Sequence, residues 1–200
     1  MTRGTIIDKA LQKAEILHKG QVRKSDGVTP YITHLKEVAG ILKKYTSDEH
    51  VIAAGILHDA IEDTPYTPEA LEHDFGLVIR DIVMGVTEKK MRDGKKIPWK
   101  VRKEAYLHNL QHVSRNSLLV CAADKVHNMN SCVHDFQKQG SSVWSSFNAE
   151  PKEQVWYYGA VLHILTGRLR HSRAKGILAE YRVAFDRFCG IAESFYAQYE

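Results

Sequence analysis

The stretch "ILHDAIEDT", residues 56 to 64, contains the residue types of this sequence best suited to chemistry. It holds a His-Asp pair, His58 and Asp59, and each member is followed four residues later by an acid, Glu62 or Asp63. On a helix, that spacing sets both acids beside the His-Asp pair. Adjacent imidazole and carboxylate groups can share a divalent first-row metal ion. A strongly apolar run precedes these four polar groups, and buried charges are costly unless they are paired or bound to metal. The stretch therefore predicts a site at the mouth of an apolar helix.

Two other His-Asp pairs occur in the chain, His73-Asp74 in "LEHDF" and His134-Asp135 in "CVHDF". Both are expected near the C-terminal end of a helix with polar neighbours. A histidine in that position can simply favour the helix dipole. We interpret these two pairs as structural, which leaves the first pair as the candidate for chemistry.

A metal ion needs more ligands than one dipeptide offers, and two residues elsewhere could supply them. His34 lies within "YITHLKEVAGIL", flanked by core-type positions, where a histidine alone is more often a satisfied core residue. Asp124 follows six apolar or small residues in "SLLVCAADKVHNM", and an aspartate there needs a cationic partner. Together with His58 and Asp59, these residues predict a site of two histidines and two carboxylates.

The elements that must position these residues are almost all helices, because the apolar residues recur at helical spacing. No stretch alternates apolar and polar residues for long enough to indicate a sheet. We therefore expect an all-α fold, a compact multi-helix bundle in a single domain over residues 1–200. The expected helices are 5–19, a segment beginning at Thr29-Pro30, 48–62 capped by Ser47, 68–75 from Thr67-Pro68 to Gly76, 77–87, 99–113 after Pro98, 118–136 after Ser117, 152–170 and 173–198, with 138–153 as a loop.

The composition is that of an ordinary globular protein, with 44% hydrophobic and 26% charged residues among 200. No apolar run approaches the roughly 20 residues that span a bilayer, so no membrane association is expected. The N-terminal segment is too charged for a signal peptide, and the three cysteines form no CxxC zinc motif. A cytoplasmic location is expected. The last helix carries an apolar stripe, for which core packing is favoured over a dimer interface, so a homo-oligomer is left open.

The net charge of +4 is too small to indicate a dedicated nucleic-acid binder. The densest basic stretch is "EKKMRDGKKIPWKVRK", residues 88 to 103. A solvated loop and helix start is the favoured interpretation of this stretch. Attraction of a phosphorylated ligand is the functional alternative, and nucleic-acid binding is the less favoured one.

Four motifs carry a resemblance to a known family: "HKGQVRKSDGVTPYITHLKEVAGIL", "AAGILHDAIEDTPYTPEALEHDFG", "IVMGVTE" and "LLVCAADKVHNM". The order His, His-Asp, Asp resembles that of the HD-domain metal-dependent phosphohydrolases. The motifs in combination look like the hydrolase domain of Rel/Spo-type alarmone enzymes, over about residues 14 to 135, and the length is similar to that of the stand-alone small alarmone hydrolases. One departure is Leu35, which stands where that family usually has proline; we expect it to adjust the helix without removing the metal.

The resemblance implies an enzyme that removes the 3′-pyrophosphate from a guanosine alarmone such as ppGpp, as in the stringent response. It implies one Mn²⁺ ion held by His34, His58, Asp59 and Asp124, with other divalent metals open. Glu62 and Asp63 match the family's acidic pair, which would handle protons during hydrolysis. Because these acids lie close together, their titrations would be coupled, and acid and base roles are not separately assigned.

The resemblance also implies which residues bind the phosphorylated nucleotide. Arg23 and Lys24 match an Arg-Lys pair that flanks the nucleobase pocket, and Lys125 could reach a phosphate. Asn128 and Ser131 follow on the same helix and suit ribose and base contacts. The alternatives are an HD phosphohydrolase for another nucleotide, such as an adenosine alarmone, a nucleoside monophosphate or NADPH, and a nucleotide-binding module without catalysis.

Overall fold

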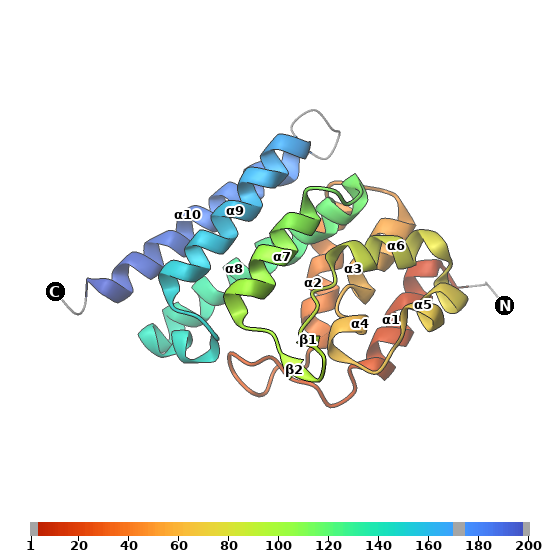
Figure 1. Ribbon diagram of the computed structural model, residues 1–200, viewed down its shortest axis with the longest axis horizontal. Coiled ribbons are helices and arrows are strands. Elements are labelled where there is room, and N and C mark those ends of the chain that lie inside the picture. The colour runs from red at the N-terminus through yellow and green to blue at the C-terminus, as the bar shows by residue number, and fades with distance from the viewer. Residues whose placement is uncertain (1–3, 170–174, 198–200) are drawn as a thin grey trace.

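The structure, a computed structural model, describes residues 4–169 and 175–197, and it confirms the all-α expectation (Figure 1). Its elements in chain order are α1 (Ile6–Leu17), α2 (Ile32–Lys43), α3 (Glu49–Leu57), α4 (Ala60–Asp63), α5 (Pro68–Phe75), α6 (Leu77–Val86), β1 (Met91–Arg92), β2 (Lys95–Lys96), α7 (Trp99–Leu110), α8 (Arg115–Gln139), the 3₁₀ helix η1 (Gly140–Ser146), α9 (Pro151–Leu169) and α10 (Gly176–Tyr196). None of the helices in these residues is both long and apolar enough to cross a membrane.

Helix α8 is the centre of the bundle. It packs against α2, α3 and α6 on the N-terminal side and against α9 and α10 on the C-terminal side. Figure 1 shows α9 and α10 side by side at one end of the molecule and α1 to α6 at the other, with α7 and α8 between them. Every residue from Ser117 to Asp124 is buried, which accounts for the apolar run before Asp124 and places its carboxyl group inside the protein.

Helix α3 is also buried on all sides, from Val51 to Leu57. A Cβ added to Gly55 would lie 2.2 Å from Leu42 Cδ1, so glycine allows the close approach of α2 and α3. The prediction of one continuous helix through residue 62 is wrong. Helix α3 ends at Leu57, and the His-Asp pair forms a break before the single-turn helix α4. This break lets the pair face the centre of the bundle.

Two predicted helix boundaries are confirmed in atomic detail. Helix α5 begins after Thr67, whose hydroxyl accepts a hydrogen bond from Ala70 N, with Pro68 in the first turn. It ends at Gly76, which has a φ of 83°, a conformation that glycine adopts without strain.

Other predicted boundaries are shifted by a few residues. Helix α2 begins at Ile32, α3 after Asp48 and α8 after Ser114, rather than at Thr29-Pro30, after Ser47 and after Ser117. In α8 the hydroxyl of Ser114 accepts a hydrogen bond from Ser117 N, so the serine three residues upstream is the cap. Neighbouring residues can all serve as caps, and the local sequence does not decide between them.

The segments expected to be loops are partly ordered. Residues 91–96 form a short antiparallel hairpin, β1–β2, whose turn residues Asp93 and Gly94 both have positive φ. Helix α8 runs to Gln139 and is followed by η1, so the loop predicted from residue 138 is wrong for its first half. The helix ends predicted at 170, 173 and 198 lie outside the described residues.

The apolar stripe of α10 serves core packing, as expected. Ile177, Tyr181 and Phe188 are fully buried, and the Tyr181 hydroxyl donates a hydrogen bond of 2.9 Å to Tyr158 O of α9. The stripe is therefore covered by the helices of its own chain.

Candidate metal centre and active site

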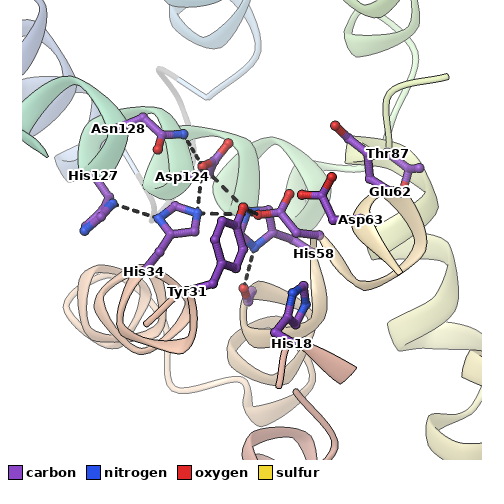
Figure 2. A network of polar contacts seen from close by, with 12 residues as sticks. His18, Tyr31, His34, His58, Glu62, Asp63, Thr87, Asp124, His127 and Asn128 are labelled. Atoms are coloured by element: carbon purple, nitrogen blue, oxygen red, sulfur yellow. Dashed lines mark hydrogen bonds and ion pairs between the residues drawn. The ribbon is translucent and has the colours of Figure 1, made fainter. Parts of the chain in front are cut away.

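Four side chains from three regions of the chain converge at the centre of the bundle, and Figure 2 labels three of them, His34, His58 and Asp124. His34 comes from α2, Asp124 from α8, and His58 and Asp59 from the break between α3 and α4. His34 Nε2 lies 3.4 Å from Asp124 Oδ1 and 3.6 Å from Asp59 Oδ2. His58 Nε2 lies 3.0 Å from Asp59 Oδ2 and 3.6 Å from Asp124 Oδ1. Leu35, beside the first histidine, is fully buried in the core. The structure thus brings together all four predicted ligands.

The convergence fits a divalent metal ion. His58 Nδ1 is paired with the carbonyl oxygen of Gly55 at 2.8 Å, while the buried His58 Nε2 lies near Asp59 and Asp124 but forms no well-aligned hydrogen bond with the described residues. A ligand atom from each of His34, His58 and Asp59 lies within 4.8 Å of the others. Imidazole nitrogens and carboxylate oxygens are a donor set that first-row divalent ions accept. This nitrogen, beside two carboxylates, has the position of a metal ligand.

Neighbouring residues that the sequence did not single out hold the ligands in place. The Nδ1 atoms of His127 and His34 lie 2.8 Å apart, which directs His34 Nε2 toward the cluster. The hydroxyl of Tyr31 donates a hydrogen bond of 2.6 Å to Asp59 Oδ2, and the ring of His18 stacks on Tyr31. Partners of this kind orient metal ligands. Their position in the sequence could have pointed to them, because Tyr31 and His127 each stand three residues from a candidate ligand, which is about one helical turn.

Charges around the cluster keep its carboxylates ionised. Burial opposes ionisation of Asp124, but the Lys125 charge and the contacts with the two histidines hold the pKa of Asp124 well below its usual range. Lys125 Nζ lies 2.6 Å from Asp124 Oδ2. Burial, with the charge of His34 beside it, lowers the pKa of His127 to about 3. His127 is therefore neutral and can accept or donate one hydrogen bond to the ligand histidine.

The acidic pair lies beside the ligand cluster. Glu62 Oε2 accepts a hydrogen bond of 3.0 Å from Glu88 N, and Lys90 Nζ lies 3.0 Å from Glu62 Oε1 and also contacts Asp63 Oδ1. Burial and the charge of Asp59 raise the pKa of Glu62, while Lys90 opposes the rise. Lys90, just before the hairpin, is a further site residue that the sequence did not identify.

Two adjoining cavities contain the predicted site residues. A cavity of about 180 Å³ is lined by the four ligand residues, the acidic pair, Lys125 and Asn128. A larger one of about 560 Å³ shares seven lining residues with it, among them Glu62 and Lys125. All five predicted substrate-binding residues line the larger cavity: Arg23, Lys24, Lys125, Asn128 and Ser131. Arg23 Nη2 donates to Asn128 Oδ1 at 3.2 Å, so the N-terminal loop and α8 meet there.

The basic stretch is divided between solvent and the cavity. Lys95 and Lys96 of the hairpin are exposed, as a solvated loop requires. In contrast, Arg102 and Lys103 line the larger cavity and pair with the buried carboxylate of Glu88, with N–O distances of 3.1 Å and 2.7 Å. The favoured interpretation of a wholly solvated stretch is therefore wrong for these two cations.

The other two His-Asp pairs lie outside the ligand cluster. The side chain of His73 is 88% exposed, and Asp74 pairs with Lys13 at 2.7 Å and accepts a hydrogen bond from a tyrosine. Asp135 was expected to have only a structural place near a helix end, but it lines the larger cavity.

Comparisons with known proteins agree with this geometry. A sequence profile described as "HD domain" matches residues 10–155. A Xenopus tropicalis protein named guanosine-3′,5′-bis(diphosphate) 3′-pyrophosphohydrolase MESH1 is 34% identical over 173 residues, covering 83% of this chain and 92% of that protein. A Haemophilus influenzae protein named guanosine-3′,5′-bis(diphosphate) 3′-pyrophosphohydrolase is 37% identical over 120 residues, and the matched part is 57% of this chain but 17% of that protein.

Solved structures show the same fold. A structure titled "A metazoan ortholog of SpoT hydrolyzes ppGpp and plays a role in starvation responses" superposes with a TM-score of 0.74 at 24% identity, covering 94% of this chain and 97% of the other. A Listeria monocytogenes protein superposes with a TM-score of 0.68 at 30% identity, covering 76% of this chain and 96% of the other.

Proposed function

Because this chain belongs to the HD domain family, we propose that it is a metal-dependent hydrolase that removes the 3′-pyrophosphate from guanosine 3′,5′-bis(diphosphate). The observation that carries the proposal is the convergence of two histidines and two carboxylates beside a cavity of about 560 Å³ that is rich in cations. The match over 92% of a small relative that is named for this activity supports the choice of substrate. One continuous cluster of buried side chains supports the proposal that the chain acts as a single domain.

In this proposal His34, His58, Asp59 and Asp124 hold one Mn²⁺ ion. A bound divalent cation polarises a phosphoryl oxygen and lowers the pKa of water. The contact between His34 Nδ1 and His127 Nδ1 and the hydrogen bond that Tyr31 donates to Asp59 orient the ligands before substrate arrives.

The acidic pair moves the protons in this proposal. Glu62 is half-buried, has a raised pKa and stands one helical turn from Asp59, so its carboxyl oxygen is suited to accept a proton from water. The Lys90 ammonium contacts both Asp63 and Glu62. Its positive charge reduces the repulsion between the two carboxylates, so both can lie close together without both being protonated. Because both carboxylates contact this cation, their titrations are coupled, and the acid and base roles are not assigned to one or the other.

The cations lining the cavity neutralise the substrate's phosphates. Lys125 and Lys103 lie near the ligand cluster, where they can bind the leaving pyrophosphate. Arg23 and Lys24 flank the nucleobase, and Asn128 and Ser131 contact the ribose and base. Positioning and charge neutralisation supply most of the catalysis in phosphoryl transfer.

Two alternatives have different experimental signatures. The same centre could serve an adenosine alarmone, a nucleoside monophosphate or NADPH, since one metal cluster can act on many phosphate esters. A nucleotide-binding module without catalysis is disfavoured by the presence of all four ligands and both acids.

The free cysteines Cys121, Cys132 and Cys189 support the proposed cytoplasmic location, because disulfides are rare there.

A nucleotide panel tests the proposal. Purified protein with Mn²⁺ is incubated with guanosine 3′,5′-bis(diphosphate), the adenosine counterpart, nucleoside monophosphates and NADPH. We expect pyrophosphate release from the guanosine alarmone and loss of turnover in EDTA. Release of phosphate or pyrophosphate from another member of the panel, with none from the guanosine alarmone, would show that this other nucleotide is the substrate. No turnover with any member would favour the binding module.

A further inference from the structure

Two buried polar side chains on α9 have no hydrogen-bond partner within residues 4–169 and 175–197. Gln154 is 5% exposed, Tyr157 is 3% exposed, and both line the larger cavity. The hydroxyl of Tyr157 is buried and unpaired. The side-chain amide of Gln154 forms no hydrogen bond with the described residues, and its polar atoms are not among the fully buried ones. Neither group takes part in the chemistry proposed above.

Gln154 interrupts an otherwise hydrophobic helix face. The buried residues of α9 recur at helical spacing: Pro151, Gln154, Tyr157, Tyr158, Val161, Leu165 and Leu169. At this position a leucine would fill the space without leaving a polar group unpaired. An amide on such a face is unfavourable unless it is hydrogen-bonded, so the Gln154 side chain is placed to pair with whatever occupies the cavity, water or ligand.

Tyr157 marks the border of the cation-rich end of the cavity. Lys103 Nζ lies 4.5 Å and Lys125 Nζ 5.9 Å from the centroid of its ring. Lys125 in turn pairs with Asp124 of the ligand cluster. This end therefore has the positive charge that phosphates require.

The next turn of α9 has a different chemistry. Gln154 stands three residues from Tyr157, nearly one turn toward the start of the helix. The residues that line the cavity from η1 and the segment after it include Val143, Phe147 and Asn148, none of which is charged. A neutral wall with an aromatic ring and an amide suits a nucleobase, which has flat apolar faces and a hydrogen-bonding edge.

We infer that Gln154 is a specificity-determining residue that reads the hydrogen-bonding edge of the substrate's purine. The inference rests on the proposed function and deepens it. A carboxamide donates and accepts at once, so it can pair with an edge that offers an adjacent donor and acceptor. A phosphate offers only acceptors and fits the lysines at the other end.

Binding measurements in EDTA test this inference without turnover. The probes are guanosine 3′,5′-bis(diphosphate), its adenosine counterpart and inorganic pyrophosphate, each titrated calorimetrically. We expect Gln154→Leu to weaken nucleotide binding about tenfold, as the loss of a buried hydrogen bond implies, and to leave pyrophosphate binding within about twofold. Gln111→Leu, the same change at an exposed residue at the end of α7, is the matched control and leaves all three affinities unchanged.

A second variant separates base reading from packing. Gln154→Glu keeps the shape but only accepts hydrogen bonds, which suits the adjacent N–H donors of guanine and not the edge of adenine. We expect the ratio of guanosine to adenosine affinity to rise in this variant. A purely structural role would weaken all probes together and leave the ratio unchanged.

The outcomes separate this inference from the proposed function. If the wild type binds nucleotides no more tightly than pyrophosphate, or if both variants keep wild-type affinities and ratio, the inference is overturned. Equal loss of pyrophosphate and nucleotide binding in both variants also overturns it. A wild type that binds nucleotides through Gln154 but hydrolyses none overturns the proposed function alone.

Discussion

The pairs His58-Asp59 and His73-Asp74 have the same residue types and opposite environments. His58 is 4% exposed and faces two carboxylates, whereas the side chain of His73 is 88% exposed and, among the described residues, its one polar contact is with Asp74 at 3.2 Å. Asp59 lies within 3.6 Å of a histidine from another helix, and Asp74 lies in an ion pair with Lys13 on α1. The dipeptide alone therefore does not identify a candidate site. The histidine and carboxylate that other helices place beside it do.

The largest effect is expected for Asp59→Ala. Removing this carboxylate takes away a ligand and a negative charge that the metal requires, so we expect turnover to be abolished and Mn²⁺ affinity to fall sharply. The apolar core is untouched, so the helical circular dichroism spectrum should stay close to that of the wild type. Retained turnover in a folded Asp59→Ala protein would show that the reaction does not depend on the His58-Asp59 pair.

The acidic pair gives the next largest effect. Glu62→Gln keeps the size and the hydrogen bond from Glu88 N but removes the group that accepts a proton. We expect kcat to fall by about 10² to 10⁴, the usual contribution of general acid–base catalysis, with Mn²⁺ binding preserved. Turnover and a metal titration on the same preparation decide the matter. Loss of metal binding would instead make Glu62 a ligand.

A smaller effect is expected for the histidine that supports His34. His127→Phe keeps a ring of similar volume but removes the contact between the two Nδ1 atoms at 2.8 Å. Loss of such a partner typically lowers metal affinity by about 10- to 100-fold, which competition with a chromophoric chelator can measure. His73→Phe is the matched control on the exposed pair, and equal affinities in the two variants would contradict the positioning role.

The smallest effect is expected for Asp74→Ala, which should keep turnover and lose stability of about 1 kcal/mol. Hydrogen bonds and ion pairing with Lys13, and the Tyr66 hydroxyl, lower the pKa of Asp74 in the folded protein. An aspartate with a depressed folded pKa stabilises the protein above its unfolded pKa, about 3.9, and that stability is lost as the pH falls through the folded pKa. The stability difference between wild type and Asp74→Ala should therefore shrink below about pH 4, as denaturant unfolding at pH 7 and pH 3 can show. A constant difference would assign the effect to packing.

Local signals in the sequence were enough to identify most helices and the candidate ligands. The start at Thr67-Pro68 and the end at Gly76 follow from rules that act within one turn, and the structure obeys them. His34, Asp59 and Asp124 stood out because each is a polar residue in an apolar context, which is visible along the chain.

The tertiary structure decided what these residues meet. The His34–His127 contact joins residues 93 positions apart, and the hydrogen bond from Glu88 N to Glu62 joins positions 26 apart. The break of the helix at His58-Asp59 and the turn of Lys103 into the cavity likewise depend on neighbouring elements. Helix signals act between residues three or four apart, so the sequence alone indicated where most helices lie and which residues are ligand candidates. Contacts across the bundle arise only when the apolar faces pack, so the packing alone decided how the centre is assembled.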